Sequence, residues 1–113
     1  MPLFRRRFAE VVERQLDLFA ADHAGDLGAI EAARDQHRRA AAGDEAEAFG
    51  DYQDRVDWAA EDLLGLRDGF AATLDPDGER GYRRAFARAA ARRFPELAAA
   101  IRDDREAEED LGL

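Results

Sequence analysis

The sequence contains no Ser, Cys, Lys or Asn, and its single aliphatic hydroxyl is that of Thr73. A serine or cysteine acyl-transfer centre and a lysine Schiff base each require a side chain that is missing here. The phosphate-binding loop that ends in Gly-Lys-Ser/Thr is excluded for the same reason. Catalytic chemistry is left to carboxylates, arginines, two His and two Tyr. We therefore expect a protein that is not an enzyme.

The absence of lysine makes every basic residue an arginine, and acids outnumber the arginines to give a net charge of −9. Such a molecule repels nucleic acid and anionic membranes as a whole. Without cysteine there is no disulfide framework. The N-terminal segment reaches an acid at Glu10 before a signal-like apolar run develops, and no window approaches the roughly 18 apolar residues of a membrane span. We expect a soluble, cytoplasmic protein that binds neither membranes nor, in general, nucleic acid.

Residues that favour strands are also scarce, because only Val, Ile and Thr at six positions are β-branched. Alanine, leucine, arginine and glutamate dominate, and these residues favour helices. The sequence predicts an all-α, antiparallel helical bundle of four to five helices with one long central helix. We assign residues 1–102 to a single domain and residues 103–113 to an acidic, frayed C-terminal tail.

Helix boundaries are marked by glycine, proline and aspartate. The expected helices cover about residues 3–22, 26–42 and 44–74, with a fourth after the Asp75–Gly78 turn and a fifth from Pro95. Short connections predict that the first three run up, down and up, so that the first two form a hairpin and the third lies parallel to the first.

The third predicted helix is longer than the first two, so its segment after about Asp62 overhangs the predicted hairpin. This overhang is the most apolar part of the chain, and it predicts self-association as a homodimer. The residues expected to carry that contact are Leu63, Leu66, Phe70 and Leu74. Two alternatives stay open: the helix bends near Gly65 or Gly69, or the last two helices cover the overhang within one chain.

A second face of the same helix carries Trp58 together with Gly65 and Gly69, away from the main apolar stripe. Acids surround the tryptophan, and a tryptophan with a polar rim is typical of an interface hot spot. Trp58 is therefore a candidate for binding a further protein partner. The alternative is that another helix of the same chain covers it.

Four arginines recur at four-residue intervals in the fourth predicted helix: Arg80, Arg84, Arg88 and Arg92. Such a row can bind phosphate, a nucleic-acid backbone or an acidic protein. It can also pair with acids of the third helix or of a second subunit, and the negative net charge favours this structural role. We include the row among the candidate partner-binding residues.

Polar residues on apolar faces give a second class of hypothesis, a small-ligand or carboxylate-based protein that uses His37, Tyr52 or Tyr82. His37 and Gln15 are expected to point inward and to make buried hydrogen bonds, and His23 to cap the first helix. The Glu-x-x-His spacing of di-iron bundles is absent, so no metal or cofactor is expected. The favoured function is a non-enzymatic helical protein–protein interaction or assembly module.

Overall fold

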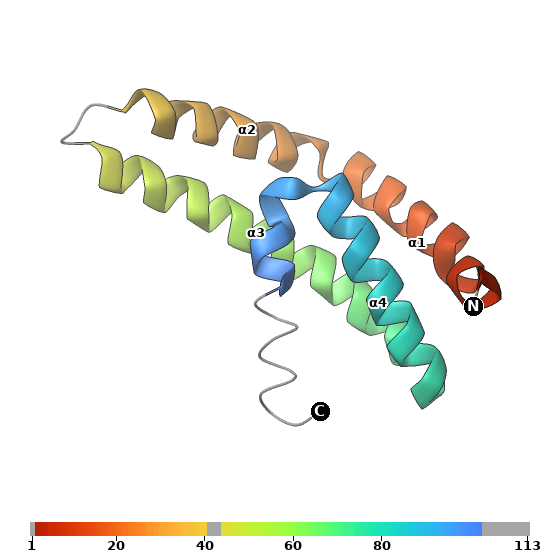
Figure 1. Cartoon of the computed structure of the whole chain (residues 1–113). Helices are drawn as coiled ribbons and strands as arrows, with labels where there is room; N and C mark the ends of the chain where they lie inside the picture. The colour runs from red at the N-terminus through yellow and green to blue at the C-terminus, as the bar shows by residue number, and fades with distance from the viewer. Residues whose placement is uncertain (1, 41–43, 103–113) are drawn as a thin grey trace.

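A computed structural model describes residues 2–40 and 44–102, and its elements are all helical (Figure 1). The elements are α1 (Pro2–Asp22), α2 (Ala24–Arg39), α3 (Glu45–Ala71), α4 (Pro76–Arg93) and the 3-10 helix η1 (Pro95–Leu97), followed by a helical segment at 98–102. No strand occurs in this part of the chain. The predicted all-α bundle with one long helix is confirmed. The predicted tail 103–113 lies outside the described residues.

The helices α1 and α2 lie end to end as one bent rod rather than side by side (Figure 1). Hydrogen bonds of helical spacing continue through the junction: His23 N donates to Phe19 O at 2.9 Å, and Leu27 N donates to His23 O at 2.8 Å. A chain reversal would interrupt this ladder. The predicted hairpin of the first two helices is therefore wrong, and His23, with φ −113° and ψ 22°, marks a kink.

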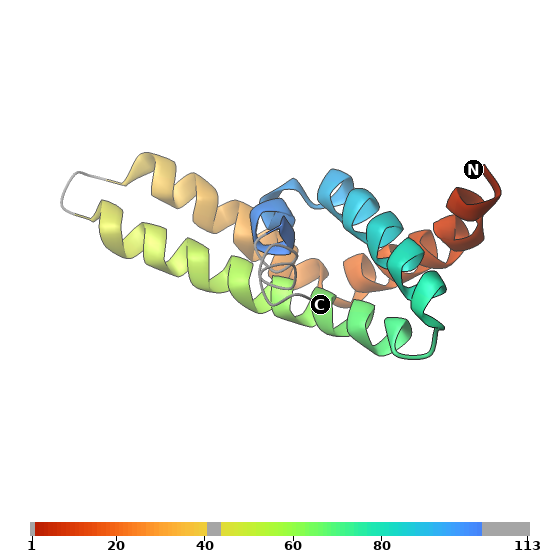
Figure 2. The same ribbon diagram turned by 60° about the horizontal axis from the view of Figure 1, so that its bottom comes forward.

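The chain instead reverses between α2 and α3, which run antiparallel and extend together beyond the rest of the molecule (Figure 2). α2 ends at Arg39, before the predicted end at Ala42, and residues 41–43 lie outside the described part. α3 is a continuous helix of 27 residues, so the predicted alternative of a bend at Gly65 or Gly69 is also wrong.

α4 begins at Pro76, because the residues predicted to form a turn there instead form the cap and first turn of the helix. The Asp75 carboxylate accepts a hydrogen bond from Gly78 N at 2.6 Å, and Pro76 occupies the first helical position. Aspartate at the cap and proline in the first turn are both preferred there. A Cβ on Gly78 would lie 2.8 Å from Asp75 Oδ1, so the capping carboxylate would have to shift to admit a larger residue there.

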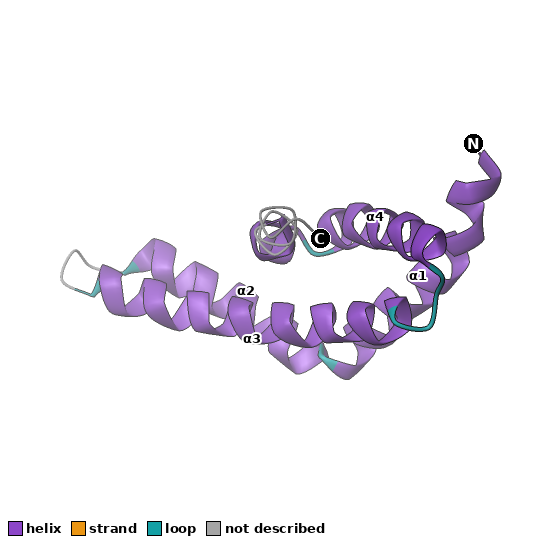
Figure 3. Ribbon diagram, turned by 90° about the horizontal axis from the view of Figure 1, so that it is seen from below, coloured by secondary structure: helices purple, strands orange, loops and turns teal. Residues whose placement is uncertain are grey.

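α4 folds back against both α1 and the C-terminal half of α3 (Figure 3). Its Tyr82 ring is fully buried and lies 5.7 Å from the Phe8 ring, 4.7 Å from the Phe70 ring and 5.8 Å from the Phe86 ring, measured between centroids. Phe19 and Phe94 meet edge-on at 5.2 Å further along. This aromatic cluster is the core that joins the three helices.

Candidate functional site

A groove of about 710 Å³ runs between α1 and α4. The four predicted arginines, which we call the arginine row, all line it. Small or apolar residues form much of both its α4 side and its α1 side, namely Ala9, Val12, Gly81, Ala85 and Ala89. Glu13 and Asp77 also line the groove, so its charge is mixed but predominantly positive. The arginines that recur in the sequence thus line one concave surface in the structure.

Gly81 lies where α4 packs against Phe8 of α1, beside the groove. A Cβ added there would lie 3.5 Å from Phe8 Cε2, which is ordinary van der Waals contact. Alanines at 85 and 89 continue this small-residue stripe along α4, one and two turns later. Their short side chains leave a shallow floor, while the longer arginine side chains of the same helix form its rim.

Most of the arginine row has no ionic partner within the described residues. Arg80 pairs with Asp77 on its own helix, whereas Arg84, Arg88 and Arg92 make no ion pair with any described residue. The three are exposed. The expected pairing of the row with acids of the third helix is therefore wrong for the residues that the structure describes.

The neighbouring arginines supply those pairs instead. Arg83 Nη1 donates to Asp68 Oδ1 at 2.9 Å across the α3–α4 contact, and Arg93 pairs with Asp17 on α1. Arg83 and Arg93, which pair with other helices, thus lie beside the arginine row, on the faces of α4 that meet α3 and α1. The row itself is left to face the solvent along the groove.

Trp58 is the second exposed feature and has 63% of its surface accessible. No part of the described chain covers it, so the predicted alternative of intramolecular cover is wrong. Acids surround it on what we call the outer face of α3, which consists of Asp51, Asp54, Trp58, Glu61 and Asp62 and continues to Gly65 and Gly69. All of these residues are exposed. A Cβ on either glycine would meet nothing within 4 Å.

The four residues expected to drive self-association are largely covered within the chain. Leu63 is 0% exposed, and Phe70 and Leu74 are partly buried against the core, while Leu66 is 37% exposed. The premise of an uncovered overhang is therefore wrong, because α4 packs over this part of α3. Self-association through Leu63, Leu66, Phe70 and Leu74 stays a prediction.

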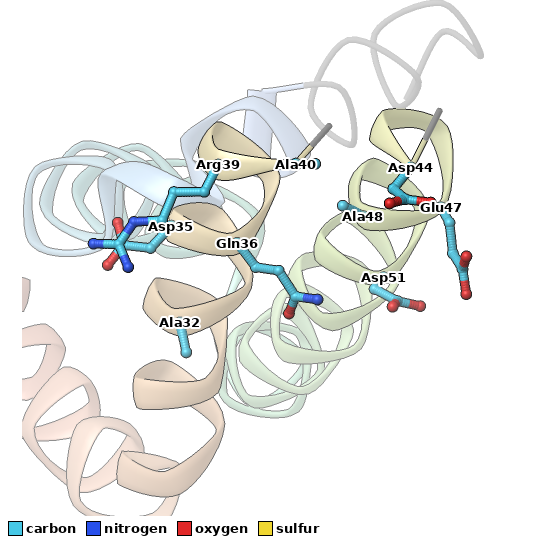
Figure 4. Close-up of a pocket in the computed structure, with 9 residues that line it drawn as sticks. All are labelled: Ala32, Asp35, Gln36, Arg39, Ala40, Asp44, Glu47, Ala48 and Asp51. Atoms are coloured by element: carbon cyan, nitrogen blue, oxygen red, sulfur yellow. The ribbon is translucent and has the colours of Figure 1, made fainter. Parts of the chain in front are cut away.

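A polar cleft of about 680 Å³ lies between α2 and α3 at the far end of the molecule (Figure 4). Asp35, Asp44, Glu47 and Asp51 all line it, but their carboxylates do not converge: Asp35 lies beside Arg39 on α2, whereas Glu47 and Asp51 point away from that helix. Among the described residues no group of three or more His, Cys, Asp or Glu side chains is arranged to hold a metal ion. We therefore assign no metal-binding site to this cleft.

The inward polar residues have separate partners. Tyr82 Oη donates to Gln15 Oε1 at 2.8 Å, which confirms the predicted inward hydrogen bond of Gln15. His23 Nδ1 lies 3.2 Å from Phe19 O, as expected for a cap, and its Nε2 lies 3.2 Å from Asp62 Oδ2. The His37 ring lies 5.5 Å from that of Phe49. The structure does not bring His37 together with Tyr82.

Sequence reasoning missed one buried charge, Arg67, which is 5% exposed on the inner side of α3. Its guanidinium reaches Asp68 Oδ1 at 2.7 Å, and the same carboxylate oxygen accepts from Arg83. Arg67 lies one turn after Leu63 on the buried stripe, which is the signal that could have revealed it. Burial raises the pKa of the nearby Tyr82 hydroxyl to about 12, against the opposing effect of the positive charges of Arg67 and Arg83.

No helix in the described ranges has the length and apolarity needed to cross a membrane. Comparison of the chain with known protein families, with curated proteins and with solved structures finds no match.

Proposed function

We propose that the chain is a non-enzymatic protein–protein interaction module that holds an acidic, amphipathic helix in the α1–α4 groove. The observation that carries this proposal is the state of Arg84, Arg88 and Arg92, which line one groove, are exposed and have no ionic partner among the described residues. Arginine binds carboxylates in bidentate geometry, so a row of them favours an acidic partner.

The spacing of the row suits a helix. Arginines four residues apart on α4 are separated by about 6 Å along the helix axis, which is also the rise between acids four residues apart on a partner helix. The floor of small and apolar residues gives an amphipathic helix a place for its apolar side chains, as in other helix-in-groove contacts. Ion pairs with the arginines and apolar contacts with the small residues would then both stabilise the bound helix.

A protein partner fits this groove better than a nucleic acid does. None of the described residues that line it is aromatic, so it lacks the stacking platform on which single-stranded bases are held. The net charge of −9 also opposes approach to a polyanion that extends beyond the groove. A short acidic helix meets only the local positive charge.

A peptide-binding assay tests the proposal. The probe is a synthetic helical peptide with glutamates at every fourth position on one face and leucines beside them, and its binding is measured by fluorescence anisotropy. We expect the Arg84→Ala/Arg88→Ala variant to bind at least about tenfold more weakly, because two charge-assisted contacts are lost.

Two controls make the outcome decisive. The Arg14→Ala/Arg39→Ala variant removes the same charge from exposed positions outside the groove and should bind as the wild type does. A single-stranded oligonucleotide of similar charge should bind weakly. Equal binding by the groove variant would overturn the proposal, and preference for the oligonucleotide would favour the alternative of nucleic-acid backbone binding.

A further inference from the structure

One molecule carries both halves of an acid–arginine contact, on surfaces that lie on different helices. The arginine row of α4 is positive and concave, whereas the outer face of α3 is acidic and convex around an exposed tryptophan. We propose that the α1–α4 groove of one copy receives the outer face of α3 of a second copy. This inference rests on the proposed function of the groove and names its partner.

The two surfaces match in length. From Arg80 to Arg92 the row spans about 18 Å along α4, and from Asp51 to Asp62 the acids span about 17 Å along α3. Opposite charges of equal extent can face each other over three turns of helix. Asp62 already contacts His23 and Arg80 already pairs with Asp77 within one chain. The charges that remain for a contact between copies are Asp51, Asp54 and Glu61 on α3 and Arg84, Arg88 and Arg92 on α4.

The two surfaces cannot satisfy each other within one chain. α3 packs against α2 and α4 through the stripe that contains Val56 and Leu63, and Trp58 lies on nearly the opposite side of that helix. Trp58 and the arginine row are accordingly exposed at the same time. The outer face of a second copy can instead contact the arginine row of the first.

Trp58 provides the apolar anchor of this contact. Its ring is large and mostly exposed, and tryptophan is among the side chains that contribute most when an interface covers them. The alanines and Gly81 that line the groove offer such a ring a surface of short side chains to contact. Arginine guanidinium groups also stack favourably on the face of an indole.

Contact between two different surfaces has a specific consequence for assembly. The interface is heterologous, so an open oligomer of any size retains one free groove at one end and one free outer face at the other, and growth proceeds head to tail unless a ring closes. A two-fold dimer through Leu66 would instead stop at two copies. The size distribution as a function of concentration distinguishes the two arrangements.

The experiment uses two complementary variants of the full chain. The groove variant carries Arg84→Glu and Arg88→Glu, and the face variant carries Asp54→Arg and Trp58→Ala. All four positions are exposed, and circular dichroism verifies that each variant is folded. Analytical ultracentrifugation should show concentration-dependent oligomers for the wild type and monomers for each variant alone.

Mixing the variants gives the sharpest result. The groove variant keeps an intact outer face, and the face variant keeps an intact groove, so an equal mixture should form a 1:1 complex and nothing larger. Trp58 is the only tryptophan of the chain, and the face variant lacks it. A shift of the mixture's tryptophan emission to shorter wavelength therefore reports burial of the groove variant's Trp58 in the complex.

The matched control is Arg14→Glu/Arg39→Glu, which reverses two exposed charges elsewhere and should associate as the wild type does. A wild type that stays monomeric at high micromolar concentration, a mixture without a complex, or variants that still dimerise alone would each overturn the inference. If the wild type is monomeric but the groove still binds the acidic probe peptide, the proposed function stands and only the second copy is rejected as its partner.

Discussion

The Tyr82 hydroxyl donates a hydrogen bond to Gln15 Oε1 across 2.8 Å and so joins α4 to α1 beneath the groove. The tyrosine is fully buried, and the glutamine is half-buried. A buried hydroxyl needs such a partner, because an unpaired one loses its hydrogen bond to water without compensation. This contact holds the two helices that form the groove in register.

Alkaline pH should destabilise the fold through this tyrosine. Burial raises the pKa of Tyr82 to about 12 in the folded chain, whereas the unfolded chain has the ordinary value near 10. Between these values the unfolded state releases the proton that the folded state keeps, so the contribution of Tyr82 to stability is constant below about pH 10 and falls as the pH rises toward 12. Urea unfolding at pH 8, 10 and 11 measures the slope. Tyr82→Phe should flatten it; an unchanged slope in that variant would assign the effect elsewhere.

Removal of Asp68 should destabilise the α3–α4 contact. Its carboxylate accepts hydrogen bonds from the buried Arg67 and from Arg83, so Asp68→Ala weakens the pairing of a desolvated charge. We expect a loss of roughly 1 to 3 kcal/mol in the free energy of unfolding. Chemical denaturation measures it. Asp57→Ala is the matched control, because Asp57 is exposed and, among the residues that the structure describes, accepts only from Gln53 at 2.9 Å. A loss as large as that of Asp68→Ala would contradict the assignment.

Asp75 should be needed at the start of α4. Asp75→Ala removes the acceptor for Gly78 N and should cost about 1 kcal/mol of unfolding free energy, whereas Asp75→Ser keeps an acceptor and should lose much less. Thermal unfolding followed by circular dichroism compares them. Equal losses for alanine and serine would mean that the side-chain oxygen is not what stabilises this helix start.

Gly65 and Gly69 should be replaceable in the isolated chain. Both lie inside α3, where a Cβ meets nothing within 4 Å, so each change to alanine should stabilise the helix by about 0.5 to 1 kcal/mol. The melting temperature of dilute protein should therefore rise. Gly78→Ala is the contrasting variant and should lower it, since its Cβ would lie 2.8 Å from Asp75 Oδ1. A fall on changing Gly65 or Gly69 would indicate that another helix approaches them closely.

The features set by neighbouring residues along the chain were predictable. Aspartate and proline at 75 and 76 marked the boundary before α4, although these residues were expected to form a turn and instead begin the helix. The apolar periodicity around Gln15 identified it as an inward polar residue, which bonds to Tyr82. The four-residue spacing of the arginine row was equally visible. Each of these depends on helix geometry, which a short sequence window determines.

The features that depend on which helices are neighbours were not predictable. His23 to Asp26 has the composition of a break, yet the hydrogen-bond ladder continues through His23, and α2 leaves as an extension of α1. The predicted reversal between α2 and α3 is present, but α1 does not pack beside α2 as predicted, and the cover over Leu63 and the exposure of Trp58 depend on that difference. The groove likewise required knowing that Ala9 of α1 faces α4.

The kink at His23 also determines how far the α2–α3 pair reaches from the groove. α2 has 16 residues and is about 24 Å long, so a change of about 10° at the kink would move its far end by about 4 Å. His23 Nε2 lies 3.2 Å from Asp62 Oδ2, and this contact links the vertex of the bend to the middle of α3. His23 at the vertex thus adds one side-chain contact to the packing of α2 on α3 that fixes the direction of α2.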